Sequence, residues 1–191
     1  MSPLRFREVP KLTTDDELRG FARVVVRGGT YDDERTRAEV VEAVRQAGQR
    51  DPERRADALI ADARESLATD QASWPTDTDY DALQRAFASL EAADIPVLQA
   101  IEDHWTTKAE LERRDDAGLP CRGIAWFTAP DVWHAVDHGM LEVNVWHPDS
   151  ANVADGDALL DEVVAALAEQ GIDGHFDEGR IEVSAHWHRC R

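Results

Sequence analysis

The sequence predicts an α+β fold in which an N-terminal helical region precedes a ferredoxin-like, mostly antiparallel sheet with helices on one face. Three observations lead to this prediction. Apolar residues recur at helical spacing through the first 70 residues, helix and strand patterns alternate from residue 73 onward, and two short strands close the chain around a turn at 177–179. With 42% hydrophobic and 31% charged residues, the 191-residue chain can bury a core.

The first part of the chain predicts three helices. Thr14 and Glu17 form a capping-box pattern before the first, which ends at a Gly-Gly pair. The second begins at the paired aspartates 32–33 and ends at Gly48. Asp51-Pro52 supplies an N-cap and an N1 proline for the third helix, whose apolar positions follow the i, i+3, i+4, i+7 spacing closely.

A boundary is predicted at Ser73-Trp74-Pro75, where the helical pattern breaks. It divides the chain into an N-terminal helical region, 1–72, and an acidic α+β domain, 73–191. The charge balance changes at the same place. Residues 1–70 hold 13 basic and 15 acidic residues, whereas residues 71–191 hold 8 basic and 24 acidic residues.

Within the α+β domain, helix and strand patterns alternate. Caps, glycines and apolar spacing predict four helices, over 80–90, 107–118, 130–139 and 155–171. Short apolar or alternating runs predict five strands, over 95–101, 123–127, 140–147, 172–176 and 180–187. Because the run 123–127 is apolar at every position but one, we expect that strand to be covered on both faces.

Apolar and polar residues alternate along the strands 140–147 and 180–187, which predicts one core face and one polar face. If both strands lie in one sheet with helices on the apolar face, five side chains share the other face: Glu142, Trp146, Glu182, His186 and His188. An aromatic residue with acids and imidazoles would form a recognition surface. The alternatives are a face left to water and a face covered by the N-terminal helices.

A second group of polar residues lies on the predicted helix 130–139. Helical spacing places Asp131, His134 and His138 on its exposed side. Two histidines four residues apart can chelate zinc, with the carboxylate as a third ligand. The alternative is a solvated helix face, since the segment lacks the Glu of the zinc-hydrolase signature. We expect this group and the histidines of the last strand to lie in different layers, and so to form separate sites.

The net charge of −18 argues against a nucleic-acid partner and favours a basic or mixed-charge protein partner. No stretch of about 20 apolar residues is present, so neither a membrane span nor a signal peptide is expected. Two cysteines are too few for a disulfide-framed scaffold. We therefore expect a cytoplasmic protein with free thiols.

Several short motifs are spread over about 20–190: Trp74-Pro75, Asp79, Asp81, Ala86-Phe87-Ala88, Leu90, Ala135-Val136, Gly139, Leu141, Val163-Val164-Ala165-Ala166-Leu167 and Gly171-Ile172. Together they resemble the pattern of a family of bacterial proteins known only as a domain of unknown function. The resemblance implies a shared fold and no activity. The chain departs from the family pattern at 102–105, where a glycine-containing segment is expected, so we expect this loop to differ in shape.

No phosphate-binding loop, dinucleotide-binding motif or nucleophile elbow is present. The favoured hypothesis is a non-catalytic cytoplasmic protein-interaction or regulatory module with an acidic surface and no cofactor. The alternative hypothesis is a metal-binding protein or metal-dependent hydrolase that uses a histidine cluster with zinc or another divalent metal. A third hypothesis is that the N-terminal helices form a homodimer.

Overall fold

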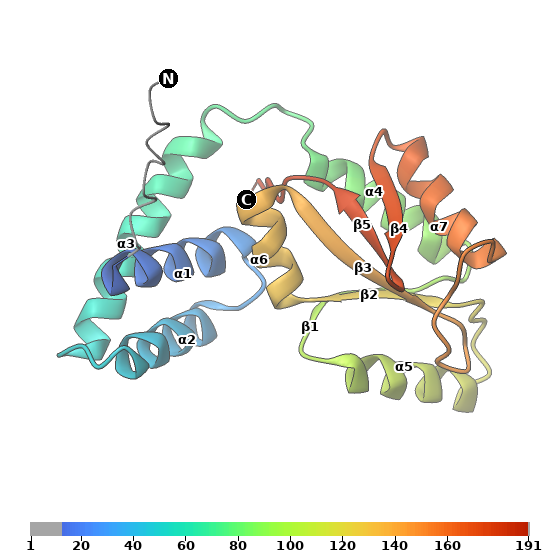
Figure 1. Cartoon of the computed structure of the whole chain (residues 1–191), viewed down its shortest axis with the longest axis horizontal. Helices are drawn as coiled ribbons and strands as arrows, with labels where there is room; N and C mark the ends of the chain where they lie inside the picture. Colours follow the sequence, from blue (N-terminus) through green and yellow to red (C-terminus); the bar gives the residue numbers. More distant parts are fainter. Residues whose placement is uncertain (1–12, 191) are drawn as a thin grey trace, which may run out of the picture.

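The computed structural model describes residues 13–190 and has an α+β fold with the N-terminal helices first (Figure 1). The three predicted N-terminal helices are confirmed as α1 (Thr14–Gly28), α2 (Asp33–Gln46) and α3 (Pro52–Gln71). The capping box of α1 is one residue earlier than predicted, because Thr13 and Asp16 form it. Asp51 makes no side-chain cap bond, so Pro52 alone marks the start of α3 as predicted.

Nine further elements follow the N-terminal helices. In chain order they are α4 (Asp79–Ala92), β1 (Val97–Ile101), α5 (His104–Asp116), β2 (Ile124–Thr128), α6 (Ala129–His138), β3 (Met140–Trp146), α7 (Ala158–Glu169), β4 (Asp173–Asp177) and β5 (Arg180–Ser184). Among residues 13–190, no helix is long and apolar enough to cross a membrane.

The strands form one sheet in the order β1-β2-β3-β5-β4. β1 and β2 are parallel neighbours, and the other three pairings are antiparallel. The sheet is therefore mixed. The ferredoxin-like topology is not confirmed, because in that topology another strand separates the two strands of each parallel pair, whereas here β1 and β2 are adjacent. Adjacent parallel strands need a crossover connection, and α5 supplies it.

Helices cover both faces of the sheet, which corrects the expectation of helices on one face. α4 and α7 bury the main apolar cluster against one face, where Phe127, Val143 and Ile181 are fully or almost fully buried. α5 covers the opposite face over β1 and β2, with Leu111 packed against Ile124 and two tryptophans. Figure 1 shows α5 alone at the bottom of the view, apart from α4 and α7.

The N-terminal helices have their own apolar cluster, centred on α1, α2 and α3. They contact the rest of the molecule mainly through α6, which lies between them and the sheet (Figure 1). Phe21 meets Trp133 edge to face, with ring centroids 5.5 Å apart, and Arg23 forms an ion pair with Asp137.

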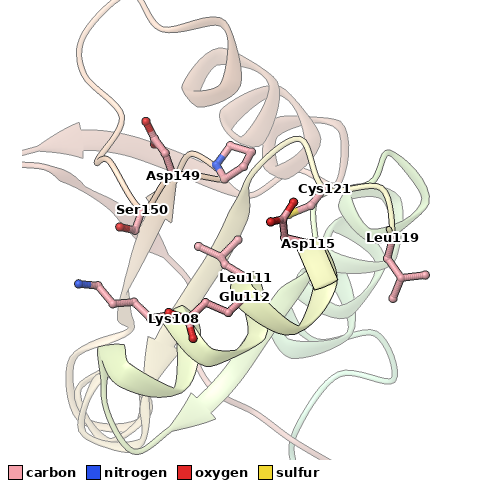
Figure 2. Close-up of a pocket in the computed structure, with 9 residues that line it drawn as sticks. Lys108, Leu111, Glu112, Asp115, Leu119, Cys121, Asp149 and Ser150 are labelled. Atoms are coloured by element: carbon pink, nitrogen blue, oxygen red, sulfur yellow. The ribbon is translucent and has the colours of Figure 1, made fainter. Parts of the chain in front are cut away.

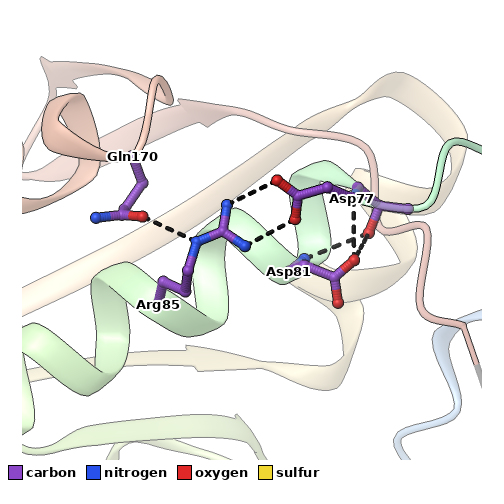
Figure 3. Close-up of polar contacts among 5 residues, drawn as sticks. Asp77, Asp81, Arg85 and Gln170 are labelled. Atoms are coloured by element: carbon purple, nitrogen blue, oxygen red, sulfur yellow. Dashed lines mark hydrogen bonds and ion pairs between the residues drawn. The ribbon is translucent and has the colours of Figure 1, made fainter.

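The connection between α3 and α4 contains the predicted boundary and is held by one arginine (Figure 3). Arg85 of α4 donates two hydrogen bonds to Asp77, at 2.7 and 3.1 Å, and one to the side chain of Gln170 beyond α7, at 2.9 Å. Thr78 and Asp81 form the capping box of α4 beside it. The connection is therefore tied to both helices of the apolar sheet face.

The last strand is shorter than predicted, because β5 ends at Ser184 and the chain continues without regular structure. Trp187 lies in this continuation. Its side chain is buried in the main cluster, and its Nε1 donates a 2.9 Å hydrogen bond to the Gly28 carbonyl at the end of α1. Arg189 likewise donates to the Gly29 carbonyl at 2.7 Å. The C-terminal segment, 185–190, thus joins the sheet to the N-terminal helices.

Candidate interaction surface

The sheet has one face opposite the main apolar cluster, and α5 covers that face over β1 and β2. The part of the same face formed by β3, β5 and β4 lies beside α5. In each strand, every second side chain points to this side, and the residues between them point into the main apolar cluster. We call this side the acidic face. Its acidic members are Glu142, Glu182, Asp173 and Asp177.

Two carboxylates of the acidic face are direct cross-strand neighbours. Glu142 of β3 pairs with Glu182 of β5, and both side chains are half-buried. Arg180 forms an ion pair with Glu142. The hydrogen bond to Glu142, followed by the negative charges of Glu142, Asp131 and Glu178, raises the pKa of the Arg180 guanidinium. Within residues 13–190, Glu182 forms no ion pair or side-chain hydrogen bond, so this face holds an uncompensated acid.

The prediction that five residues share this face is only partly matched by their positions. Glu142, Trp146 and Glu182 lie on it, although Trp146 is only 8% exposed because α5 covers it. His186 and His188 follow the end of β5 and belong to the C-terminal segment. Regular strand pairing ends at Ser184, but the alternation of burial continues, because Ala185 and Trp187 are buried and His186 is exposed. The two histidines lie at the junction with the N-terminal helices.

These two histidines form an aromatic stack with Trp74. The ring centroid of His188 lies 4.4 Å from that of Trp74 and 5.2 Å from that of His186, and all three rings are nearly parallel. The backbone N–H of His186 donates to Asp79 at 2.9 Å. Burial is the main cause that lowers the pKa of His188, and the neighbouring charges of His186 and Arg27 add to it while Asp79 opposes it.

The predicted metal group is only partly assembled. His134 and His138 are neighbours as expected, with ring centroids 4.7 Å apart. Asp131 instead accepts hydrogen bonds from the backbone and hydroxyl of Thr128, both at 2.7 Å, and so caps α6. Over the described part of the chain, no three His, Cys, Asp or Glu side chains are grouped to hold a metal ion. Because the Asp131 carboxylate caps α6, it is engaged and not available as the third metal ligand.

The two histidine groups approach each other at Gly139, but they form no joint metal-binding cluster within residues 13–190. The ring of His186 packs so closely on Gly139, directly after α6, that a Cβ there would lie 2.5 Å from it. Gly139 also has a positive φ of 68°, so the turn from α6 into β3 suits glycine on both grounds.

A group of aromatic rings lies at the edge of the acidic face, and no local sequence pattern predicts it. Trp126 contacts Trp146 edge to face, with ring centroids 5.0 Å apart. The ring centroid of His104 lies 6.4 Å from that of Trp146 and 4.6 Å from that of Trp105. Trp105 is 62% exposed. It lies in the first turn of α5 because Asp103 caps that helix, accepting from the backbone N–H of Trp105 at 3.0 Å. The predicted start at Thr107 had placed Trp105 outside the helix.

The sequence also gave no signal for a cleft beside α5. Its volume is about 380 Å³, and it lies between α5 and the connection from β3 to α7 (Figure 2). Cys121 lines it and donates a hydrogen bond from its thiol to the Gly123 carbonyl at 3.3 Å. Burial raises the pKa of this thiol, which favours the neutral form. The lining joins residues far apart in the sequence, so only the folded chain brings them together.

A comparison with protein-family models matches residues 12–191 to a family described as Domain of unknown function (DUF6891). The match confirms the resemblance to a family known only as a domain of unknown function. The comparisons with curated proteins and with solved structures find no match. The family description names no activity, ligand or partner, so functional inference rests on the surface itself.

Proposed function

Because the chain belongs to the family Domain of unknown function (DUF6891), which provides no activity to transfer, we propose a function from its surface. The protein is a non-catalytic interaction or regulatory module that binds a basic or mixed-charge protein partner through the acidic face. It acts in the cytoplasm, where its two free cysteines stay reduced.

The observation that carries this proposal is the cross-strand pair of Glu142 and Glu182. Like charges directly opposite each other on two strands destabilise a sheet by about 0.2–1 kcal/mol. In the free protein Arg180 compensates only Glu142. A lysine or arginine from a partner would compensate Glu182 as well, so binding relieves a cost that the free protein carries.

The overall charge supports a partner of the same kind. A net charge of −18 attracts basic surfaces over a distance and speeds their encounter. Nucleic acids are repelled by the same charge, since their recognition needs a basic face. The exposed Trp105 at the edge of the face offers an apolar anchor, a residue type that often dominates binding energy.

The experiment is a selection of short random peptides on the purified protein, followed by affinity measurements with the peptides that it enriches. We expect enriched peptides to be rich in lysine and arginine. Their affinity should fall strongly between about 0.1 M and about 1 M salt, because the screening length shrinks from about 10 to about 3 Å.

Two double variants locate the site. Glu142→Gln with Glu182→Gln should weaken the selected peptides about tenfold, which corresponds to about 1.4 kcal/mol. Glu65→Gln with Glu169→Gln changes the net charge equally at exposed positions on α3 and α7, and should leave the affinity nearly unchanged. Enriched peptides without basic residues, or equal losses in the two double variants, would contradict the proposal.

A further inference from the structure

The cleft beside α5 has the dimensions of a binding site. Its volume of about 380 Å³ lies within the range of about 300–1,000 Å³ usual for ligand pockets. One wall is the outer side of α5, with Lys108, Glu112 and Asp115, and the other is the connection that carries Asp149 and Ser150. Figure 2 shows these side chains, with Cys121 beside Asp115 and Leu119 at one end.

The two ends of this wall are apolar. Trp105, 62% exposed, and Leu119, 44% exposed, are the only exposed large hydrophobic residues within 13–190. Trp105 lies in the first turn of α5 and Leu119 shortly after its end. From Trp105 to Asp115 the helix rises about 15 Å at about 1.5 Å per residue. Leu119 lines the cleft, and Trp105 lies one helical turn before Lys108, which also lines it.

The middle of the cleft is acidic, because the two arginines of α5 bond to Glu110 and do not line the cleft. Glu110 accepts two hydrogen bonds from Arg113, both at 2.7 Å, and one from Arg114 at 2.8 Å. In the described part of the chain, Glu112 and Asp115 have no side-chain hydrogen bond or ion pair. Their carboxylates line the cleft without a compensating cation.

The one cation in the lining is partly engaged. The ammonium of Lys108 lies 5.0 Å from the ring centroid of Trp105, within the range of a cation–π contact. It therefore belongs to the apolar end of the cleft, and the carboxylates of Glu112, Asp115 and Asp149 dominate the rest.

We propose that this cleft binds a short extended segment of the partner protein, with an arginine or lysine at its centre and an apolar residue at each end. The proposal rests on the proposed function and names the chemistry of the partner. The apolar ends contact Trp105 and Leu119, and the central cation contacts Glu112 and Asp115. The rise of about 15 Å from Trp105 to Asp115 corresponds to about five extended residues at about 3.3 Å each. Leu119 lies beyond Asp115, so a segment that contacts both apolar ends is somewhat longer.

The probe is the peptide Leu-Ser-Arg-Arg-Ser-Phe with blocked ends, and the readout is the alkylation rate of Cys121. The experiment uses the full chain with Cys190→Ser, which leaves Cys121 as the single thiol. At about ten times its Kd, the peptide should slow alkylation about tenfold, because about nine-tenths of the clefts are then occupied. Two control peptides replace either both arginines by glutamine or both end residues by serine, and both should protect much less.

Variants of the lining test the same assignment. Glu112→Gln with Asp115→Asn, and separately Leu119→Ser, should each raise the Kd of the probe peptide several-fold, and these exposed positions leave the core intact. Glu65→Gln with Glu169→Gln is the matched charge control. Full-rate alkylation of Cys121 at saturating peptide, or equal protection by the glutamine peptide, would overturn the proposal.

The two proposals fail in different ways. If only the cleft assignment is wrong, basic peptides bind and lose affinity with Glu142→Gln and Glu182→Gln, yet Cys121 reacts at the free rate. If only the acidic-face proposal is wrong, the probe peptide protects Cys121, and the peptides enriched by selection keep their affinity for Glu142→Gln with Glu182→Gln.

Discussion

Glu182 holds a position that is unfavourable for the stability of the free protein, because two carboxylates face each other there. It lies directly opposite Glu142, and its other cross-strand neighbour is His175 of β4. Arg180 bonds to Glu142, which leaves the charge of Glu182 without a bound cation within residues 13–190. A residue selected for stability alone would be neutral or basic here.

We therefore predict that Glu182→Gln stabilises the free protein while it weakens binding. The free energy of unfolding should rise by about 0.5 kcal/mol at low salt, since the cross-strand repulsion disappears, and by less at high salt. Urea unfolding measures it, with Glu65→Gln on the exposed side of α3 as control. A loss of stability in Glu182→Gln would mean that Glu182 has a favourable structural partner.

His188 gives a prediction about pH. Burial lowers its pKa below the ordinary value of 6.5, so the folded protein resists a proton that the unfolded chain accepts. The contribution of the neutral ring to stability is complete above pH 6.5 and is lost as the pH falls toward the lowered pKa. His188→Phe keeps an aromatic ring beside Trp74 and cannot be protonated.

The wild type should therefore lose more free energy of unfolding than His188→Phe between about pH 8 and about pH 5.5. Urea unfolding of both proteins at the two pH values measures this difference. An equal loss in both proteins would show that His188 does not contribute to the pH dependence.

At the residue scale, the sequence predicted the acidic pair but not the contacts that His186 and His188 make. Strict alternation along β3 and β5 put Glu142 and Glu182 on one face, and local geometry is enough for that. The position of His186 and His188 depends on Trp187, whose indole bonds to the Gly28 carbonyl. That contact joins residues 159 positions apart, and no local pattern encodes it.

At the scale of elements, α4 and α7 end in the same way with different residues. After α4 the N–H of Ile95 bonds to the Leu90 carbonyl, and after α7 the N–H of Ile172 bonds to the Leu167 carbonyl. The left-handed residue is Asp94, with φ 63°, in the first case and Gly171, with φ 76°, in the second. An aspartate in this conformation carries strain that glycine avoids.

We predict that Asp94→Gly raises the free energy of unfolding by about 0.5–1 kcal/mol, and that Gly171→Ala lowers it by about 1–2 kcal/mol. Urea unfolding of the two single variants provides the comparison. Both sites are exposed, and a Cβ at Gly171 would meet open space, so neither result can come from a steric clash. If Gly171→Ala were neutral, backbone conformation would not limit these helix ends.

The existence of helices and strands was predictable from the sequence, and their assembly was not. Caps, glycines and apolar spacing gave every helix to within a few residues, because these signals are local. The parallel pairing of β1 with β2 and the place of α5 on the second face depend on which strands become neighbours. This choice is made by tertiary packing, which periodicity does not record.

At the scale of the whole molecule, the C-terminal segment holds the two apolar clusters together. Trp187 belongs to the sheet cluster and bonds to Gly28, while the Arg189 carbonyl accepts from Gln71 of α3 at 3.2 Å. The ion pair between Arg35 of α2 and Glu102 before α5, at 2.6 Å, adds a third connection. We therefore expect the helical region and the sheet to unfold together.

Trp187→Phe tests this coupling. The variant leaves the Gly28 carbonyl without its donor, which should lower the free energy of unfolding by about 1–3 kcal/mol. Tryptophan fluorescence and the amide signals of α1–α3 should follow one urea transition in the wild type, and both should shift together in the variant. Trp74→Phe, which keeps the stack on His188, should change stability less. Separate transitions in the wild type would instead support two independent domains divided near residue 73.

The composition of the chain predicts its net negative charge. It does not predict where on the folded surface that charge is concentrated. The excess of acids after residue 70 predicted an acidic surface. The cleft beside α5 needed the fold, because Glu110 withdraws Arg113 and Arg114 from it and the connection after β3 forms its second wall. Sequence spacing alone could not separate the bonded acids of α5 from the uncompensated ones.

The most direct test of the central claim is a titration of the isotope-labelled protein with an arginine-rich peptide, followed by amide NMR signals. A basic partner held by the outward side of the sheet should move the signals of β3 and β5 around Glu142 and Glu182 the most, and high salt should reverse the change. Signals that move only on the side covered by α4 and α7, or that do not move at all, would contradict it.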